Sequence, residues 1–204
     1  MINTRILAQE FNYFAPKTLQ ETSDLLKQYG AEAKLMAGGT DVVILLKQEK
    51  ISPTCLINIM KIPELRYIRE DQGLRIGAAT TLREVRQYCA QGAYRVLYEA
   101  ISVLAKPQVW NMGTIGGNIC NASPAADTAP PLLVLNGRVI LLSERGERIV
   151  DLEDFFTGVN QTTMGPDEIM LEIQTDPIEE GMGNAFLKTA RVGADISKVT
   201  CAVS

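Results

Sequence analysis

The sequence Thr114-Ile115-Gly116-Gly117-Asn118-Ile119-Cys120-Asn121-Ala122-Ser123-Pro124-Ala125-Ala126-Asp127 combines adjacent glycines, small side chains and one carboxylate. It lies between two apolar segments, residues 96–105 and 131–135. Adjacent glycines can adopt positive φ angles and expose backbone N–H groups that a Cβ would shield, and turns of this kind form anion-binding concavities. This stretch alone leaves two interpretations equally open: a loop that binds a phosphate-bearing cofactor, or a tight surface turn.

A second double-glycine sequence, Gly38-Gly39-Thr40-Asp41, occurs near the start of the chain. It follows a short apolar strand expected at 34–37 and precedes a helix expected at 42–47. The order of strand, glycine turn and helix start directs free amides toward an anion. Thr40 could cap the helix and donate its hydroxyl to a phosphate; the alternative is that Thr40 and Asp41 only cap the helix. The adjacent glycines do not form a G-x-G-x-x-G fingerprint.

The composition is typical of a soluble globular protein of one or two domains, with 204 residues, 46% hydrophobic and 22% charged. A net charge of −4 and the lack of a basic run argue against nucleic acid as a partner. Apolar runs fall short of the roughly 18 residues that would cross a bilayer, so no transmembrane segment is predicted. The first residues do not resemble a signal peptide, and a cytoplasmic location is expected.

The sequence contains no histidine. This excludes Ser-His-Asp and Cys-His catalytic arrangements and any histidine-ligated metal. The cysteines, Cys55, Cys89, Cys120 and Cys201, form no CxxC pair, so no iron–sulfur or zinc site is predicted within the chain. Each cysteine is expected to be a small buried apolar residue. Any redox chemistry would therefore need an organic cofactor.

The first sixty residues follow a β-α-β-α-β order, which predicts a small parallel sheet with crossover helices. A capping box at Thr18 and Glu21 is expected to begin the first helix, and Gly30 to end it with a positive φ. Residues 1–60 are predicted to form one subdomain. Its expected strands are 12–14, 34–37 and 54–59, and its expected helices are 18–29 and 42–47.

Residues 61–190 are predicted to form a larger α+β subdomain with a mostly antiparallel sheet. Strands 169–175 and 184–189 are expected to pair with each other around Gly181-Met182-Gly183. One glycine turn in each subdomain suggests a ligand between them, such as a dinucleotide with two phosphates. The other expected strands are 65–68, 74–78, 138–143 and 148–150; the expected helices are 81–90 (capped by Thr81 and Glu84), 94–105 and 151–156.

Several motifs together resemble the FAD-binding subunit of molybdenum hydroxylases, the xanthine dehydrogenase and carbon monoxide dehydrogenase family. The resemblance covers nearly the whole chain and implies a two-subdomain FAD-binding fold of the vanillyl-alcohol oxidase type. The motifs are Phe14-Ala15-Pro16, Ala37-Gly38-Gly39-Thr40-Asp41, Asn111-Met112-Gly113-Thr114-Ile115-Gly116-Gly117-Asn118, Ser123-Pro124-Ala125-Ala126-Asp127, Lys188-Thr189-Ala190-Arg191 and Ala194-Asp195-Ile196.

The resemblance implies that FAD lies between the subdomains. Residues 35–42 would wrap its pyrophosphate, 114–118 would add a second set of phosphate contacts, and Asp127 would accept a hydrogen bond from a ribose or ribitol hydroxyl or from loop amides. Lys188 would lie near the flavin, or is an ordinary surface lysine. No catalytic residue is predicted. The predicted cofactor-binding residues are Leu35, Met36, Ala37, Gly38, Gly39, Thr40, Asp41, Val42, Leu104, Thr114, Ile115, Gly116, Gly117, Asn118, Asp127, Ile169 and Lys188.

The resemblance also implies partners. Substrate would be oxidised at a molybdenum cofactor on one subunit, and electrons would reach the flavin through an iron–sulfur subunit and pass to NAD or another acceptor. Trp110 departs from the family, which often has arginine there, and residues 191–204 are expected to begin a C-terminal domain that is absent. Two alternatives stay open: a stand-alone flavoenzyme of this fold, and an assembly domain that has lost FAD.

Overall fold

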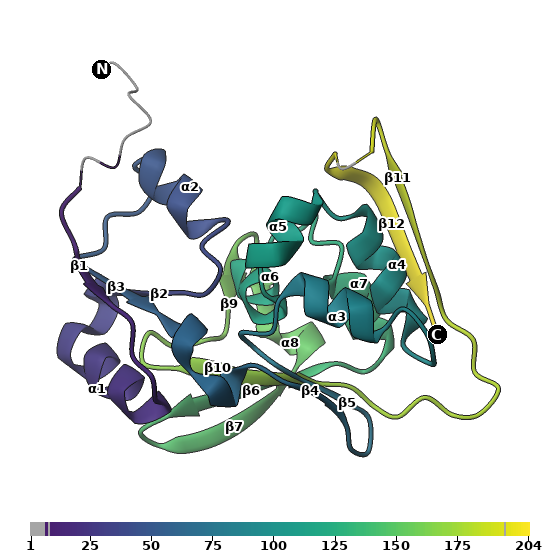
Figure 1. The fold of residues 1–204 in the computed structure, drawn as a ribbon, viewed down its shortest axis with the longest axis horizontal. Helices are drawn as coiled ribbons and strands as arrows, with labels where there is room; N and C mark the ends of the chain where they lie inside the picture. The colour runs from purple at the N-terminus through teal and green to yellow at the C-terminus, as the bar shows by residue number, and fades with distance from the viewer. Residues whose placement is uncertain (1–6, 8, 194) are drawn as a thin grey trace.

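The computed structural model describes residues 7, 9–193 and 195–204 (Figure 1). Ala194 of the Ala-Asp-Ile motif, and the first residues, on which the expectation about a signal peptide rests, lie outside the described residues.

A three-stranded parallel sheet forms from the first sixty residues, in the order β1-β3-β2. The central strand aligns Ile57 with Phe14 on one side and with Leu35 on the other. Leu26 of the first helix packs with the buried Cys55 and Ile57. The predicted small parallel sheet is therefore confirmed. Its elements are β1 (Asn12–Phe14), α1 (Leu19–Tyr29), η1 (Gly30–Glu32), β2 (Ala33–Met36), α2 (Val42–Lys47) and β3 (Cys55–Asn58).

The ends of α1 follow the prediction in part. Thr18 Oγ1 accepts the amide of Glu21 at 3.1 Å, and Gly30 has φ +53°. The Glu21 carboxylate, however, accepts the amide of Lys17 at 2.8 Å. The reciprocal half of the predicted capping box is therefore wrong.

The predicted side-chain cap of α2 is also wrong. Asp41 is the N-cap residue, with φ −99° and ψ −48°, and no side chain caps the helix. A side-chain cap needs an extended N-cap backbone, which turns the side-chain oxygen back toward the first amides. The helical backbone of Asp41 does not provide this.

A five-stranded antiparallel sheet forms the larger part, in the order β4-β5-β10-β6-β7. Helices pack on one face of it (Figure 1). The expected strand at 65–68 begins only at Ile68, because residues 63–65 form a 3-10 turn. The sheet strands are β4 (Ile68–Glu70), β5 (Leu74–Gly77), β6 (Arg138–Ser143), β7 (Gly146–Asp151) and β10 (Ile169–Gln174); β8 (Phe156–Gly158) pairs with β9 (Gln161–Thr162); η2 (Ile59–Lys61) and η3 (Pro63–Leu65) precede β4.

The helices on this sheet bury a continuous apolar core. Thr81 and Glu84 form the predicted capping box. Leu97 and Ile101, one turn apart in one helix, are fully buried with Ile76 of the sheet. The helices are α3 (Leu82–Tyr88), α4 (Arg95–Val103), α5 (Pro107–Met112), α6 (Ile115–Asn121), α7 (Ala129–Val134) and α8 (Leu152–Phe155).

The expected pairing of strands 169–175 and 184–189 is wrong. Ile173 of β10 aligns with Ile76 of β5 on one side and with Val139 of β6 on the other. Both edges of β10 are therefore occupied. The following strand instead pairs with the end of the chain, as the hairpin β11 (Ala185–Ala190) and β12 (Ser197–Val203). The predicted boundaries at residues 60 and 190 stay predictions.

The Gly116-Gly117 segment is a helix start rather than a turn. Both glycines lie in α6, which Thr114 caps with its hydroxyl, and neither has a positive φ. A Cβ on Gly116 would lie 2.6 Å from the carbonyl oxygen of Ala78 and 2.8 Å from its Cα. The glycine is needed for close packing of α6 on the end of β5, and the sequence pattern alone does not distinguish this need from a positive φ.

Replacing Gly116 with alanine should destabilise the fold. Alanine in a helix interior gains about 1 kcal/mol over glycine, but a clash with backbone atoms costs about 1–3 kcal/mol or more. We therefore expect a lower midpoint of urea unfolding, followed by circular dichroism. Gly183→Ala is the matched control, because a Cβ there meets nothing within 4 Å. An unchanged midpoint in Gly116→Ala would show that the contact with Ala78 is not a packing constraint.

Candidate functional site

The two glycine motifs lie against each other, one in the loop between β2 and α2 and the other at the junction of α5 and α6. A Cβ on Gly38 would lie 1.6 Å from the carbonyl oxygen of Met112, so only glycine allows this approach. A Cβ on Gly113 would lie 3.5 Å from Thr40 Oγ1, also across the junction. The fold thus brings together two motifs that are more than seventy residues apart in the sequence.

The first motif carries unused backbone donors. Gly39 has φ +72°, and its carbonyl accepts the amide of Val43 at 3.0 Å. Among the hydrogen bonds between described residues, none uses the amides of residues 38–42. Consecutive free amides in a glycine loop form an anion-binding concavity. The loop can therefore bind phosphate oxygens without a basic side chain.

The second motif, in contrast, uses its amides within the protein. The amide of Ile115 donates to Thr80 O at 3.0 Å, that of Gly116 to Ala78 O at 3.1 Å, and that of Gly117 to Thr114 Oγ1 at 3.0 Å. The first two amides hold the start of α6 against the segment after β5, the third is bound by the N-cap residue of α6, and none is free for a ligand. Phosphate contacts by residues 114–118 stay a prediction. The amides of residues 115–117 do not support it, because they are already hydrogen-bonded within the protein.

Asp127 and Lys188 form a buried ion pair. Asp127 ends the turn after α6, in which the amide of Ala126 donates to Ser123 O at 3.0 Å. Lys188 Nζ lies 2.7 Å from Asp127 Oδ2, with side-chain exposures of 6% and 5%. The ammonium also lies 3.4 Å from the carbonyl oxygen of Val103. The surface-lysine interpretation of Lys188 is thereby wrong.

One oxygen of this pair has an unused acceptor capacity. Asp127 Oδ1 is buried and has no hydrogen-bond partner among the described residues. Burial raises the pKa of Asp127 above its ordinary value, and the Lys188 ammonium opposes that shift. A buried carboxylate oxygen is normally hydrogen-bonded. This oxygen therefore suits a hydroxyl donor from a ligand.

Asn118 connects the second motif to the residue that follows Asp127. Its Oδ1 accepts the hydroxyl of Thr128, the residue after Asp127. Residues 112, 113 and 103 contribute to the site through backbone atoms, which is why side-chain chemistry did not single out Val103 or Met112.

Leu104 and Ile169 lie inside the protein. Leu104 is 7% exposed at the end of α4, and its carbonyl accepts Trp110 Nε1. Ile169, the first residue of β10, is fully buried and packs with Leu26 and Cys55 from the three-stranded-sheet region. Their predicted role as cofactor-lining residues stays a prediction. The burial predicted for all cysteines holds for Cys55 and Cys89 but is wrong for the exposed Cys201.

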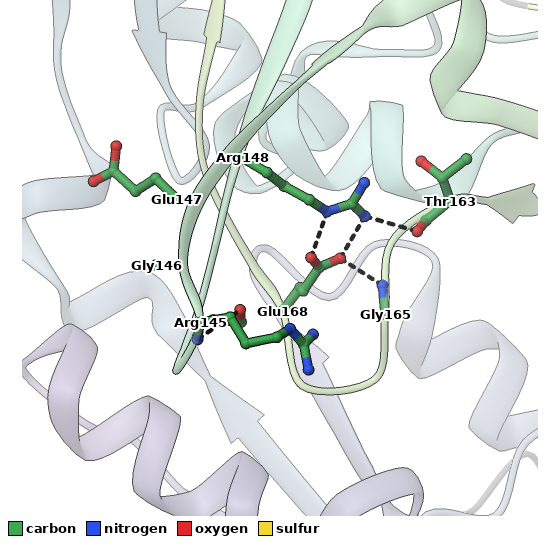
Figure 2. A pocket seen from close by; sticks show the side chains of 8 residues that line it. Arg145, Gly146, Glu147, Arg148, Thr163, Gly165 and Glu168 are labelled. Atoms are coloured by element: carbon green, nitrogen blue, oxygen red, sulfur yellow. Dashed lines mark hydrogen bonds and ion pairs between the residues drawn. The ribbon is translucent and has the colours of Figure 1, made fainter.

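A separate pocket of about 330 Å³ lies at the β6–β7 hairpin (Figure 2). Arg148 binds Glu168 through two nitrogens at 2.6 and 2.8 Å, and Glu168 also accepts the amide of Gly165 at 2.7 Å. Arg145 pairs with Asp167 at 2.9 Å. These charges satisfy one another and leave little for a ligand, so the glycine junction is the better candidate.

Among the described residues, no group of three or more His, Cys, Asp or Glu is placed to hold a metal ion. No described helix has the length and apolar character to cross a membrane.

Comparison with known proteins gives consistent matches. Residues 9–175 match the family described as the FAD binding domain in molybdopterin dehydrogenase. The chain is 38% identical over 189 residues to the nicotinate dehydrogenase FAD-subunit of Eubacterium barkeri, covering 90% of this chain and 64% of that protein. It is 36% identical over 200 residues to the carbon monoxide dehydrogenase medium chain of Hydrogenophaga pseudoflava, covering 97% and 70%. The chain thus spans about two thirds of these relatives' length.

Solved structures agree with the fold. The chain matches a carbon monoxide dehydrogenase from Hydrogenophaga pseudoflava that lacks the Mo-pyranopterin moiety, with a TM-score of 0.92 and 35% identity over 97% of this chain and 69% of that one. It matches quinoline 2-oxidoreductase from Pseudomonas putida 86 with a TM-score of 0.86 and 27% identity over 94% and 67%. From the family match and these relatives, we conclude that the chain belongs to the family of FAD-binding domains of molybdopterin dehydrogenases.

Proposed function

We propose that this chain holds FAD at the glycine junction and acts as the electron-transferring flavin subunit of a molybdenum-containing hydroxylase. The single observation that carries the proposal is the meeting of the two glycine motifs at Gly38 and Met112, with the free amides of residues 38–42 beside it. FAD has a pyrophosphate that needs many donors and hydroxyls that need acceptors. The loop amides and Asp127 Oδ1 offer both.

The chain's own residues would bind and orient the cofactor. The amides of 38–42 would donate to the pyrophosphate, and Asp127 Oδ1 would accept from a ribose or ribitol hydroxyl. When bound, FAD supplies reversible electron uptake and release, while the protein supplies position and charge. Lys188 would bring a positive charge toward the flavin, held in place by Asp127 and by the carbonyl of Val103.

The wider assembly is part of the proposal. Relatives are named as a medium chain and an FAD-subunit, which supports a complex of several subunits. We propose that electrons arrive from an iron–sulfur subunit, that substrate is oxidised at a molybdenum cofactor on another subunit, and that NAD or another molecule accepts the electrons. The cytoplasmic location stays a prediction from the sequence.

The cofactor part is tested by an absorbance spectrum of the purified chain before and after incubation with FAD and desalting. We expect the visible bands of bound flavin at one equivalent per chain. A chain that retains no flavin would overturn the proposal and favour the assembly-domain alternative.

The assembly part is tested by purification from the native host, followed by metal analysis. We expect molybdenum and iron to co-elute with the chain. Substrate turnover by the isolated chain, without these metals, would instead favour the stand-alone flavoenzyme.

Gly39→Val should prevent FAD retention. Its φ of +72° is unfavourable for a branched residue, and a Cβ there would lie 3.1 Å from Met36 Sδ. The loop would have to change shape, and its amides would no longer converge. The bound flavin is measured by absorbance after desalting.

Gly92→Val is the matched control, because Gly92 also has a positive φ, +90°, but meets nothing within 4 Å. Equal flavin content in Gly39→Val and wild type would contradict the placement of the pyrophosphate.

Asp127→Ala should weaken FAD binding by about 1–3 kcal/mol, the value of a hydrogen bond to a buried group. The dissociation constant is measured by quenching of flavin fluorescence. Asp154→Ala, at an exposed carboxylate on α8, is the control. A dissociation constant that is the same in Asp127→Ala and wild type would remove Asp127 from the site.

A further inference from the structure

Trp110, the only tryptophan of the chain, joins the two helices that precede the second glycine motif. Its indole Nε1 donates a hydrogen bond to the carbonyl oxygen of Leu104, the residue at the end of α4. Trp110 itself lies in α5, two residues before Met112, whose carbonyl oxygen meets Gly38. The end of a helix leaves carbonyl groups without an intrahelical donor, and the indole supplies one of the missing donors.

The turn that Trp110 contacts has a backbone conformation that needs support. Ala105, directly after Leu104, has φ +41°, a left-handed conformation that residues with a Cβ rarely adopt. Such a conformation persists only where the surrounding structure holds it. The hydrogen bond from Trp110 to the carbonyl immediately before Ala105 gives that support.

The guanidinium of Arg86, from α3, holds the indole in place. Its central carbon lies 5.0 Å from the centre of the Trp110 ring and 4.7 Å from that of Tyr98. Arg86 Nε also donates to Ser102 Oγ at 2.8 Å. A cation over an aromatic face is attracted by the quadrupole of the ring. Arg86 therefore fixes the indole relative to α4, which carries both Tyr98 and Ser102.

The same turn contacts Lys188. The carbonyl oxygen of Val103 lies 3.4 Å from Lys188 Nζ, which lies 2.7 Å from Asp127 Oδ2. Two consecutive carbonyls of the turn thus accept from different donors: that of Val103 from the ammonium, and that of Leu104 from the indole. Because neighbouring planar peptide units share one Cα, a rotation of the second unit changes the direction of the first.

We propose that Trp110 is a positioning residue for Lys188 in the flavin site. By holding the carbonyl of Leu104, it fixes the turn at residues 103–105, and the carbonyl of Val103 then fixes the ammonium. The inference rests on the proposed function, in which the charge of Lys188 stabilises the reduced, more negative flavin. An indole that only filled space between α4 and α5 would need its ring but not its N–H group.

The test variant is Trp110→Phe, which keeps an aromatic ring for Arg86 but removes the N–H group. The ratio of oxidised to reduced flavin is measured in the FAD-loaded chain, in equilibrium with a reference redox dye. At a fixed potential we expect this ratio to rise by about 2- to 10-fold, the range that one hydrogen bond accounts for. An unchanged ratio would overturn the inference.

Tyr88→Phe is the matched control. It removes one aromatic donor from α3, where the Tyr88 hydroxyl lies 3.3 Å from Glu70 Oε1, away from the turn. The ratio should be the same in Tyr88→Phe and wild type. An equal rise in Tyr88→Phe and Trp110→Phe would show a general effect of losing a donor and would count against a role specific to Trp110.

A double-mutant cycle with Lys188→Gln separates positioning from a general change in packing. This substitution removes the positive charge but keeps a donor for Asp127. If Trp110 acts through Lys188, Trp110→Phe should change the ratio no further in the Lys188→Gln background. A change of the same size in both backgrounds would contradict the inference.

Hydrogen exchange of the chain without FAD, followed by mass spectrometry, tests the contact independently of the cofactor. In Trp110→Phe the amides of residues 103–106 and 185–190 should exchange faster than in wild type, whereas those of α1 should not. Unchanged exchange in both segments would remove Trp110 from the turn. A wild-type chain that binds no FAD would overturn the proposed function, and with it the role in the flavin site, but would leave this exchange result as it is.

Discussion

The contact between Gly38 and Met112 leaves no room for a side chain, and the candidate site depends on it. A Cβ on Gly38 would fall 1.6 Å from a carbonyl oxygen. Because glycine has no Cβ, the loop after β2 can lie directly on the end of α5. This contact sets the loop with free amides next to the helix that Thr114 caps. The first motif therefore combines close packing at Gly38 with the free amides of residues 38–42, whereas the second motif packs α6 against the end of β5 through Gly116.

The buried pair of Asp127 and Lys188 extends this junction to the other end of the chain. Lys188 lies beyond residues 9–175, the region that matches the family. Hairpin β11–β12 carries it along α4, where Asn184 Oδ1 accepts the amide of Val96 at 2.8 Å and Glu99 accepts the amide of Phe186 at 3.0 Å. Removing one partner of a buried pair costs about 3–5 kcal/mol, so the pair ties hairpin β11–β12 to the turn after α6.

Sequence patterns predicted local structure well where neighbouring residues decide it. The alternation of strands and helices up to Asn58, the cap at Thr81 and the hairpin at Gly146 depend on short-range chemistry, and all are found. The partner of β11 was predicted wrongly, because strand pairing depends on which edges the rest of the fold leaves open. The role of Gly116 does not follow from its sequence neighbours, because the residue that requires a glycine there is Ala78, far away in the sequence.

The central claim is that one cofactor lies at the glycine junction, and a crystal structure of the chain with FAD tests it most directly. The account predicts pyrophosphate oxygens within hydrogen-bonding distance of the amides of residues 38–42, and a ligand hydroxyl on Asp127 Oδ1. FAD bound at another place, such as the pocket beside Arg148 and Glu168, with the loop amides facing solvent, would contradict it.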